Sequence, residues 1–296
     1  MSRAGITVDF DSAAPPFDQF KGFQLLTTDR RGRVSIESAR HRLYVGSDKQ
    51  SHASVLIKLT SKPGLTYQAN LENEIASLST INGSIPDSPY FPVIRTHGKL
   101  RDGRVFLIAS FFYELPLATA IGEERIPSRT VAYIRTAMEV ARALGELHSL
   151  RIFHVDLNPM NILLRLEHGK PIIRIIDFES SYEWRRHSAG VFYNPPTTPG
   201  YSAPEVSGQA PDARSDTYSL GAVLYTMLAG YKWTREVSVW KSVDADRDID
   251  PDLRAILRTA VDPDPDQRFP SMADFHASLA AHLEKIWPGR KIAGSW

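Results

Sequence analysis

The spacing of hydrophobic positions changes about a third of the way along the chain. Up to residue 108, short apolar runs bounded by polar and turn-forming residues are typical of strands. One predicted helix interrupts these runs, because Leu71, Ile75, Leu78 and Ile81 recur at helical spacing. The predicted strands cover residues 23–26, 33–37, 42–45, 55–59 and 105–108.

Beyond Glu114 the pattern is helical. Ser128 is the predicted N-cap of a helix whose apolar face runs from Val131 to Leu147. Further helices are predicted at 215–228, 251–261 and 271–286, and 180–204 reads as a loop rich in Pro and Gly. We therefore expect an α+β, bilobal protein with a small antiparallel β-rich N-lobe, which holds one helix, and a larger, mainly helical C-lobe. The predicted parts are an N-terminal extension at 1–22, the N-lobe at 23–108, a hinge at 109–117, the C-lobe at 118–286 and a C-terminal tail at 287–296.

Composition narrows the class of protein. The 296 residues carry a net charge of +1, which gives no strong attraction to nucleic acid or a membrane surface. The absence of cysteine excludes disulfides and thiolate metal sites. No signal-peptide pattern opens the sequence, and its longest mostly apolar stretch, 220–231, is too short to span a bilayer. We expect a soluble, cytoplasmic protein.

The candidate chemistry centres on residues 154–161, where Asp156 precedes Asn161 by five positions and follows His154 by two. Asp177 follows a buried-looking strand. Lys58 ends the strand run 55–58, and Glu74 on the next helix is its natural counter-ion, with Glu72 as the competitor. Phosphoryl transfer needs such groups: a carboxylate to orient the nucleophile, hard oxygen ligands for Mg²⁺, and a cation near the phosphates.

In this order, the residues resemble the protein-kinase-like superfamily over about residues 23–285. The catalytic strings, with Asn158 and Glu179, are similar to those of aminoglycoside and choline phosphotransferases. The C-terminal half resembles Ser/Thr protein kinases of the bacterial eukaryotic-like type. That likeness rests on the segments 198–205 and 215–221 and on Arg268.

The resemblance implies ATP with Mg²⁺ (or Mn²⁺) as cofactors and a protein as substrate or partner. It makes Asp156, Lys58 and Asn158 the catalytic candidates and Asn161 and Asp177 the metal ligands. Structural roles fall to Thr198 against Asp156, to Asp216 on the catalytic-loop backbone and to a Glu205–Arg268 pair. The residues implied in nucleotide binding are Gly32, Val34, Leu56, Lys58, Glu74, Ala109, Phe111 and Leu163.

The chain departs from the family pattern at two positions of the catalytic loop. Val155 replaces the arginine that pairs with a phosphorylated activation loop, so a phosphate on Ser188, Thr197 or Thr198 lacks its usual partner. We therefore expect activity without such phosphorylation. Asn158 stands where Ser/Thr kinases keep a lysine, which removes one cation near the transferred phosphate.

The predicted nucleotide-binding residues also depart from the pattern. Of the glycine-rich loop, 26–34, only Gly32 and Val34 match. The arginines at 30, 31 and 33 either supply cations to the phosphates or form a solvated hairpin tip. Leu56 replaces the small residue that lies against adenine in the family, while Ala109, at the position that resembles the gatekeeper, is small.

Three functions fit these residues: an active Ser/Thr protein kinase, a pseudokinase that acts as a binding or scaffold module, and a small-molecule phosphotransferase. The polar side chains that phosphoryl transfer needs are all present, which favours activity: Lys58, Glu74, Asp156, Asn161 and Asp177. The segment 198–205 favours a protein over a small molecule as the acceptor.

Overall fold

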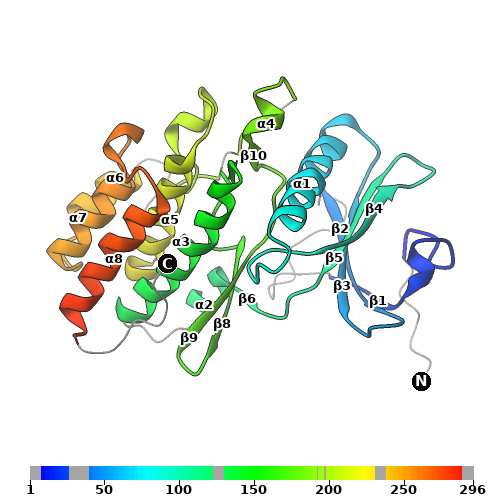
Figure 1. Cartoon of the computed structure of the whole chain (residues 1–296), viewed down its shortest axis with the longest axis horizontal. Coiled ribbons are helices and arrows are strands. Elements are labelled where there is room, and N and C mark those ends of the chain that lie inside the picture. The colour runs from blue at the N-terminus through cyan, green and yellow to red at the C-terminus, as the bar shows by residue number, and fades with distance from the viewer. Residues whose placement is uncertain are drawn as a thin grey trace. The chain divides into compact units, whose positions relative to one another are not determined.

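The computed structural model describes residues 8–26, 40–122, 130–191, 193–196, 198–230 and 238–288. The chain separates into two compact units, Met1–Tyr113 and Glu114–Trp296. The first is built on an antiparallel sheet with the helix α1, and the second is mainly helical (Figure 1). The predicted α+β fold class is therefore confirmed.

Five antiparallel strands form the sheet of the first unit, in the order β1-β2-β3-β5-β4. Four of them overlap predicted strands. The sequence missed β4, because its half-buried positions alternate with exposed polar side chains and leave no apolar run. The strand predicted at 33–37 lies outside the described residues. The strands are β1 (Phe20–Leu25), β2 (His41–Asp48), β3 (Ser54–Thr60), β4 (Ile94–Lys99) and β5 (Val105–Ser110).

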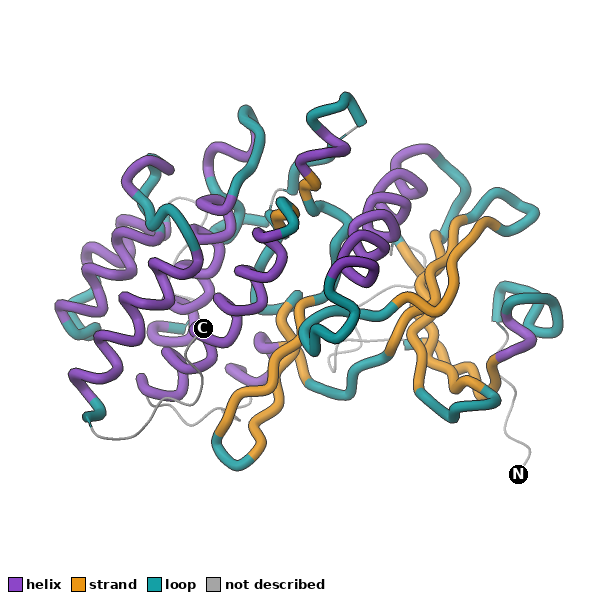
Figure 2. The backbone as a smooth tube through the Cα atoms, viewed as in Figure 1, coloured by secondary structure: helices purple, strands orange, loops and turns teal. Residues whose placement is uncertain are grey.

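The two faces of this sheet carry different partners. Val55, Ile57 and Leu59 of β3 belong to a hydrophobic cluster on one face, and the strand's alternation directs Leu56 and Lys58 to the other. The helix α1 (Leu65–Ser84) packs beside β3, β4 and β5 on that second face (Figure 2). Its predicted apolar positions are all buried: Leu71, Ile75, Leu78 and Ile81.

The segment before β1 is part of the core of this unit. Phe10 stacks on Phe17 with ring centroids 4.3 Å apart, and Phe17 packs against Phe106 of β5 at 5.0 Å. Phe17 opens a short 3-10 helix, η1 (Phe17–Gln19). The predicted boundary, which made residues 1–22 an extension, is wrong for residues 8–22. Three phenylalanines of this stretch, the third being Phe20, cover the sheet face opposite α1.

A charged cluster fixes the same segment at Asp9. Its carboxylate accepts hydrogen bonds from Arg42 and Arg104, each at 2.7 Å, and from the hydroxyl of Tyr44. Arg104 also donates to the Asp9 carbonyl at 2.7 Å. Burial and the Asp9 carboxylate raise the pKa of Tyr44 to about 12, so Tyr44 stays a hydrogen-bond donor.

In its described part, the second unit contains five longer helices, a two-stranded sheet and a three-stranded sheet. The longer helices are α3 (Thr130–Ser149), α5 (Ala213–Ala229), α6 (Val239–Ala245), α7 (Pro251–Ala260) and α8 (Met272–Ile286). The strands are β6 (Leu115–Pro116), β7 (Ile152–Phe153), β8 (Ile162–Glu167), β9 (Lys170–Ile175) and β10 (Tyr182–Glu183). The shorter helices are α2 (Leu117–Gly122), α4 (Trp184–His187), η2 (Pro204–Ser207) and η3 (Pro265–Gln267).

Helix α5 is the centre of this unit, and it contacts α3, α7 and α8. Gly221 lets α7 approach, since a Cβ there would lie 2.8 Å from side-chain carbons of Ala260 and Val261. A capping box of Asp212 and Ser215 fixes the first turn of α5. The four predicted helices of this unit correspond to α3, α5, α7 and α8, whereas α2, α4 and α6 are too short for a periodic signal. The predicted N-cap Ser128 lies outside the described residues.

The buried position of Phe17 predicts that Phe17→Ala lowers the free energy of unfolding by about 3–5 kcal/mol, because it leaves a cavity between Phe10 and Phe106. Denaturant unfolding measures the loss. The control Leu26→Ala removes an exposed side chain and should change stability by less than about 0.5 kcal/mol. Equal effects of the two variants would mean that residues 8–22 do not contribute to the core.

Candidate active site

In the first unit, Lys58 and Glu74 form a buried ion pair. The Lys58 ammonium lies 2.7 Å from Oε2 of Glu74, and their side chains are 11% and 6% exposed. Strand β3 presents the lysine to α1, which presents the glutamate. Glu72 is exposed, so Glu74 is the partner of the two that the sequence offered. The pair holds the ammonium in one place away from bulk water.

The other candidate nucleotide-binding residues lie in three places. Leu56 on β3 pairs with Ala109 on β5, and Phe111 follows β5 with its backbone N–H bonded to the Ser54 carbonyl at 3.2 Å. Leu163 belongs to β8 of the second unit and is buried. Gly32 and Val34 lie outside the described residues.

Asp156 lies in the loop between β7 and β8, with both its side chain and its backbone engaged. Its Oδ1 accepts a hydrogen bond from the Thr198 hydroxyl at 2.5 Å, the contact expected from the sequence. Its carbonyl accepts from the side-chain amides of Asn158 at 3.0 Å and Asn161 at 2.9 Å. These bonds give the carboxylate a fixed orientation.

The electrostatic surroundings of Asp156 affect its basicity. Burial is the main cause that raises its pKa, and the Asp177 carboxylate raises it too, while the Thr198 hydrogen bond opposes the rise. A carboxylate with a raised pKa holds a proton more readily than an ordinary aspartate. That property suits a group that takes a proton from a hydroxyl nucleophile.

Both the nitrogen and the oxygen of the Asn158 side-chain amide form hydrogen bonds within the loop. Its Nδ2 donates to the Asp156 carbonyl, and its Oδ1 accepts from the backbone N–H of Met160 at 2.9 Å. The side chain is buried and carries no charge. In this structure it holds the loop and supplies no cation.

Asp177 and Asn161 are brought together by the pairing of β8 with β9. Ile162 pairs with Ile175, and the backbone N–H of Ile176 donates to the Asn161 carbonyl at 3.0 Å. Asp177 then turns out of the strand with φ of +67°. Because the Asn161 amide nitrogen is bonded to Asp156, its oxygen is the atom that would bind a cation. One neutral and one anionic oxygen form a hard donor pair that fits Mg²⁺ or Mn²⁺.

The loop takes its shape from Asp216 on α5. Its carboxylate accepts hydrogen bonds from the backbone N–H groups of His154 at 2.9 Å and Val155 at 2.8 Å, as expected. Val155 has φ of +66°, a left-handed conformation that costs about 1–3 kcal/mol for a residue other than glycine. The two hydrogen bonds to Asp216 offset that strain.

His148, which the sequence analysis missed, completes the surroundings of Asp216. Its Nε2 donates to Asp216 at 2.8 Å from the last turn of α3. Asp216 is fully buried, which alone would raise its pKa, but the His148 hydrogen bond and the nearby imidazoles bring it below the ordinary value. His154 is structural: its backbone bonds Asp216, and its ring donates to the Ile176 carbonyl at 3.1 Å and packs on Phe178.

A second buried contact anchors the segment that follows Thr198. Arg268 donates to both carboxylate oxygens of Glu205, at 2.8 and 2.9 Å, and stacks over Tyr218. Ser215 donates to the same carboxylate at 2.8 Å. Burial would raise the pKa of Glu205, but Arg268 holds it below the ordinary value. The expected Glu205–Arg268 pair is therefore present.

An aromatic cluster of Tyr182, His187 and Tyr193, also missed from the sequence, packs the stretch of chain that leads to Thr198. The Tyr182 and His187 rings stack with centroids 4.9 Å apart, and Tyr193 meets them edge-on at 5.1 and 5.3 Å. Burial and the carboxylates of Asp216 and Asp156 raise the pKa of Tyr193, so its hydroxyl stays neutral. No periodic signal could reveal such a cluster, because its members come from a strand, a short helix and a loop.

Comparison with known proteins identifies the family. The protein kinase domain family matches residues 42–282, and the chain therefore belongs to the protein kinase domain family. The match begins at β2, after the phenylalanine-rich segment and β1.

The chain is similar to several curated protein kinases. It is 31% identical over 179 residues to the serine/threonine-protein kinase PknG of Mycolicibacterium smegmatis, which covers 58% of this chain and 20% of that protein. It is 45% identical over 94 residues to mouse ribosomal protein S6 kinase alpha-2, covering 31% of this chain and 13% of that protein. The chain thus spans a fifth or less of the length of these two relatives.

Solved structures match over most of the chain. The Mycobacterium tuberculosis PknI kinase domain superposes with a TM-score of 0.63 at 20% identity, covering 88% of this chain and 96% of that one. A mutant form of the same domain gives a TM-score of 0.66, with 93% and 99% covered. At this identity the likeness establishes the fold alone. Within the described residues, each helix is too short or too polar to cross a membrane.

The buried position of Asp216 predicts that Asp216→Asn destabilises the protein by about 3–5 kcal/mol. The amide carries no charge, and its NH₂ group would face the N–H groups that now donate to the carboxylate. Because the folded pKa of Asp216 lies below its ordinary value, its contribution is complete above about pH 4 and is lost as the pH falls further. Unfolding curves measured between pH 2 and pH 7 test both statements.

The matched control is Asp212→Asn at the start of the same helix. Asparagine caps a helix as well as aspartate does, so the expected loss is below about 1 kcal/mol. A loss for Asp216→Asn that is no larger than the control's would contradict the role given to Asp216.

Proposed function

We propose that this protein is a Ser/Thr protein kinase that transfers the γ-phosphate of ATP to a protein hydroxyl. The observation that carries the proposal is the 2.5 Å hydrogen bond between Thr198 and Asp156. It joins the loop held by Asp216 to the segment anchored by Glu205 and Arg268, so the base and the segment beside it form one structure. The similarity to curated protein kinases supports this reading.

The chemistry expected of Asp156 is proton acceptance. Thr198 occupies Oδ1, so Oδ2 is the oxygen that would meet the substrate hydroxyl and take its proton as phosphate transfer proceeds. The raised pKa of Asp156 helps it to hold that proton. Phosphoryl transfer otherwise depends on positioning and charge neutralisation, which the fixed loop supplies.

In the first unit the proposed contacts are with ATP phosphates, and in the second unit they are with a metal ion. Lys58, kept in place by Glu74, would pair with ATP phosphates. Asn161 and Asp177 would hold Mg²⁺ or Mn²⁺, which when bound offsets the negative charge of the phosphates. Leu56, Ala109, Phe111 and Leu163, with Gly32 and Val34, remain the proposed adenine and phosphate contacts.

The anchored segment favours a protein as acceptor. Residues 198–205 are fixed at one end by Asp156 and at the other by Arg268, and Tyr201 is tied to α5 through Thr226 at 2.9 Å. A segment fixed at both ends suits recognition of a polypeptide chain, whereas a small molecule needs a closed pocket.

The proposed role of Asp156 predicts how its replacement affects catalysis. Asp156→Asn should lower phosphate transfer by about 10²–10⁴-fold, because the amide cannot accept the proton. Asp177→Asn should lower transfer mainly by weakening metal binding. Transfer of labelled phosphate to a generic protein substrate measures both, and Asp87→Asn, which changes an exposed carboxylate of the first unit, is the control.

The outcomes separate the three candidate functions. Labelling of protein that depends on Asp156 supports the kinase. ATP binding by thermal shift without labelling would indicate a pseudokinase. ATP consumption with amino-sugars or amino-alcohols, and no labelling of protein, would indicate a small-molecule phosphotransferase.

We also propose that the aromatic cluster of Tyr182, His187 and Tyr193 takes over the anchoring that phosphate provides in other kinases. Val155 supplies no cation for a phosphate, and it is buried. The ring contacts instead pack the segment by apolar burial and edge-to-face geometry. Activity should then be independent of phosphorylation on Ser188, Thr197 or Thr198.

Removal of phosphate and substitution of Tyr193 test whether the aromatic cluster provides the anchoring. Phosphatase-treated protein should keep its activity within about twofold. Tyr193→Ala should lower it at least about tenfold, because it removes the edge-on contacts of this half-buried ring with Tyr182 and His187. Tyr193→Phe is the matched control, because the Tyr193 hydroxyl has no hydrogen-bond partner among the described residues. Activity that is lost on phosphatase treatment and regained on phosphorylation would contradict the proposal.

A further inference from the structure

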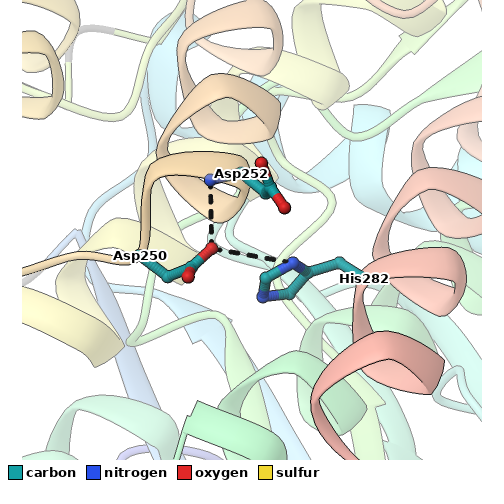
Figure 3. A group of neighbouring side chains, drawn as sticks. All are labelled: Asp250, Asp252 and His282. Carbon is teal, nitrogen blue, oxygen red and sulfur yellow. Dashed lines mark hydrogen bonds and ion pairs between the residues drawn. The ribbon is translucent and has the colours of Figure 1, made fainter.

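We propose that Asp250, Asp252 and His282 form a binding site for a divalent transition-metal ion of the zinc class. The site joins the start of α7 to the end of α8, within the second unit (Figure 3). One ligand atom from each residue lies within 4.8 Å of the others. The site shares no residue with the proposed kinase site.

His282 is the observation that points to a ligand. Its side chain is only 3% exposed, and neither ring nitrogen has a hydrogen-bond partner among the described residues. A buried imidazole without a partner is costly, so its lone pair is available to a metal ion. Its Nδ1 faces Oδ1 of Asp250 at 3.9 Å, which is too long for a hydrogen bond (Figure 3).

The two aspartates are held by the fold on the same side of this imidazole. Asp250 is the N-cap of α7, where its Oδ1 accepts from the backbone N–H groups of Asp252 at 3.0 Å and Leu253 at 3.2 Å. Capping fixes the carboxylate in place. Asp252 lies in the first turn of the same helix, and its side chain is more than half exposed. A metal ion can therefore enter from the solvent side.

The ligand set selects the metal. Imidazole nitrogen suits zinc and its neighbours, whereas Mg²⁺ and Ca²⁺ prefer oxygen ligands throughout. Tetrahedral zinc with bonds of about 2.0–2.1 Å places its ligands about 3.4 Å apart. The 3.9 Å gap between His282 and Asp250 therefore needs to close by only about half an ångström on binding. Water would complete the coordination.

Lys285 is the internal competitor for this site. One turn beyond His282 on α8, its ammonium pairs with Asp252. Both side chains are exposed, and such surface ion pairs contribute little to stability. A divalent ion can displace the ammonium, and removal of Lys285 should strengthen metal binding.

The test is zinc titration of the full chain carrying Asp177→Asn, which removes the proposed kinase metal site, with a chromophoric chelator as competitor. We expect one zinc per chain. Asp252→Asn and His282→Gln should each weaken binding at least about tenfold, through loss of one ligand. Lys285→Ala should strengthen it. His276→Gln changes another buried histidine of α8 outside the cluster and should leave affinity within twofold.

Two further readouts make the result decisive. Cobalt(II) in place of zinc should give the visible absorption of a tetrahedral site, and Asp252→Asn should abolish it. Zinc at about 100 times its Kd should raise the unfolding midpoint by about 4 °C. No saturable binding, or binding that Asp252→Asn leaves unchanged, would overturn the proposal. Asp252 is exposed, so its variant tests the site even if His282→Gln fails to fold.

Discussion

The carboxylate of Asp216 accepts hydrogen bonds from the backbone of His154 and Val155 and from the ring of His148, in a place that water does not reach. A buried charge persists only when it is this well paired. The consequence reaches Asp156, because the two backbone bonds set the path of the chain immediately before it. The central helix therefore determines where the proposed base lies.

Two kinds of anchor hold the segment after the catalytic loop. The Glu205–Arg268 pair is charged, bidentate and directional, and it fixes one end at a single position. The cluster of Tyr182, His187 and Tyr193 acts mainly by ring packing, with the backbone N–H of Glu183 donating to His187 Nδ1 at 2.9 Å. A segment held by packing is set by the folded protein itself, whereas one held through phosphate first has to be phosphorylated.

The sequence predicted those contacts whose partners belong to recognisable motifs. Lys58 with Glu74 and Asp216 with the loop backbone followed from motif order, because each residue type stood in the expected element. The contacts of Asp9 could not be predicted, since Asp9 and Arg104 are 95 positions apart and neither lies in a motif. Phe10 and Phe17 read as a loose extension because the stretch is polar and has two prolines between them, and only the folded sheet shows what they cover.

Val155 separates two properties that one residue often combines. Its left-handed backbone is imposed by Asp216, so the shape of the loop at this position does not depend on the side chain that occupies it. The side chain at 155 is itself fully buried, so valine contributes apolar packing where a charged residue would need a partner. Backbone shape and side-chain charge are therefore separate features of this position: the central helix sets the first, and the surrounding packing limits the second.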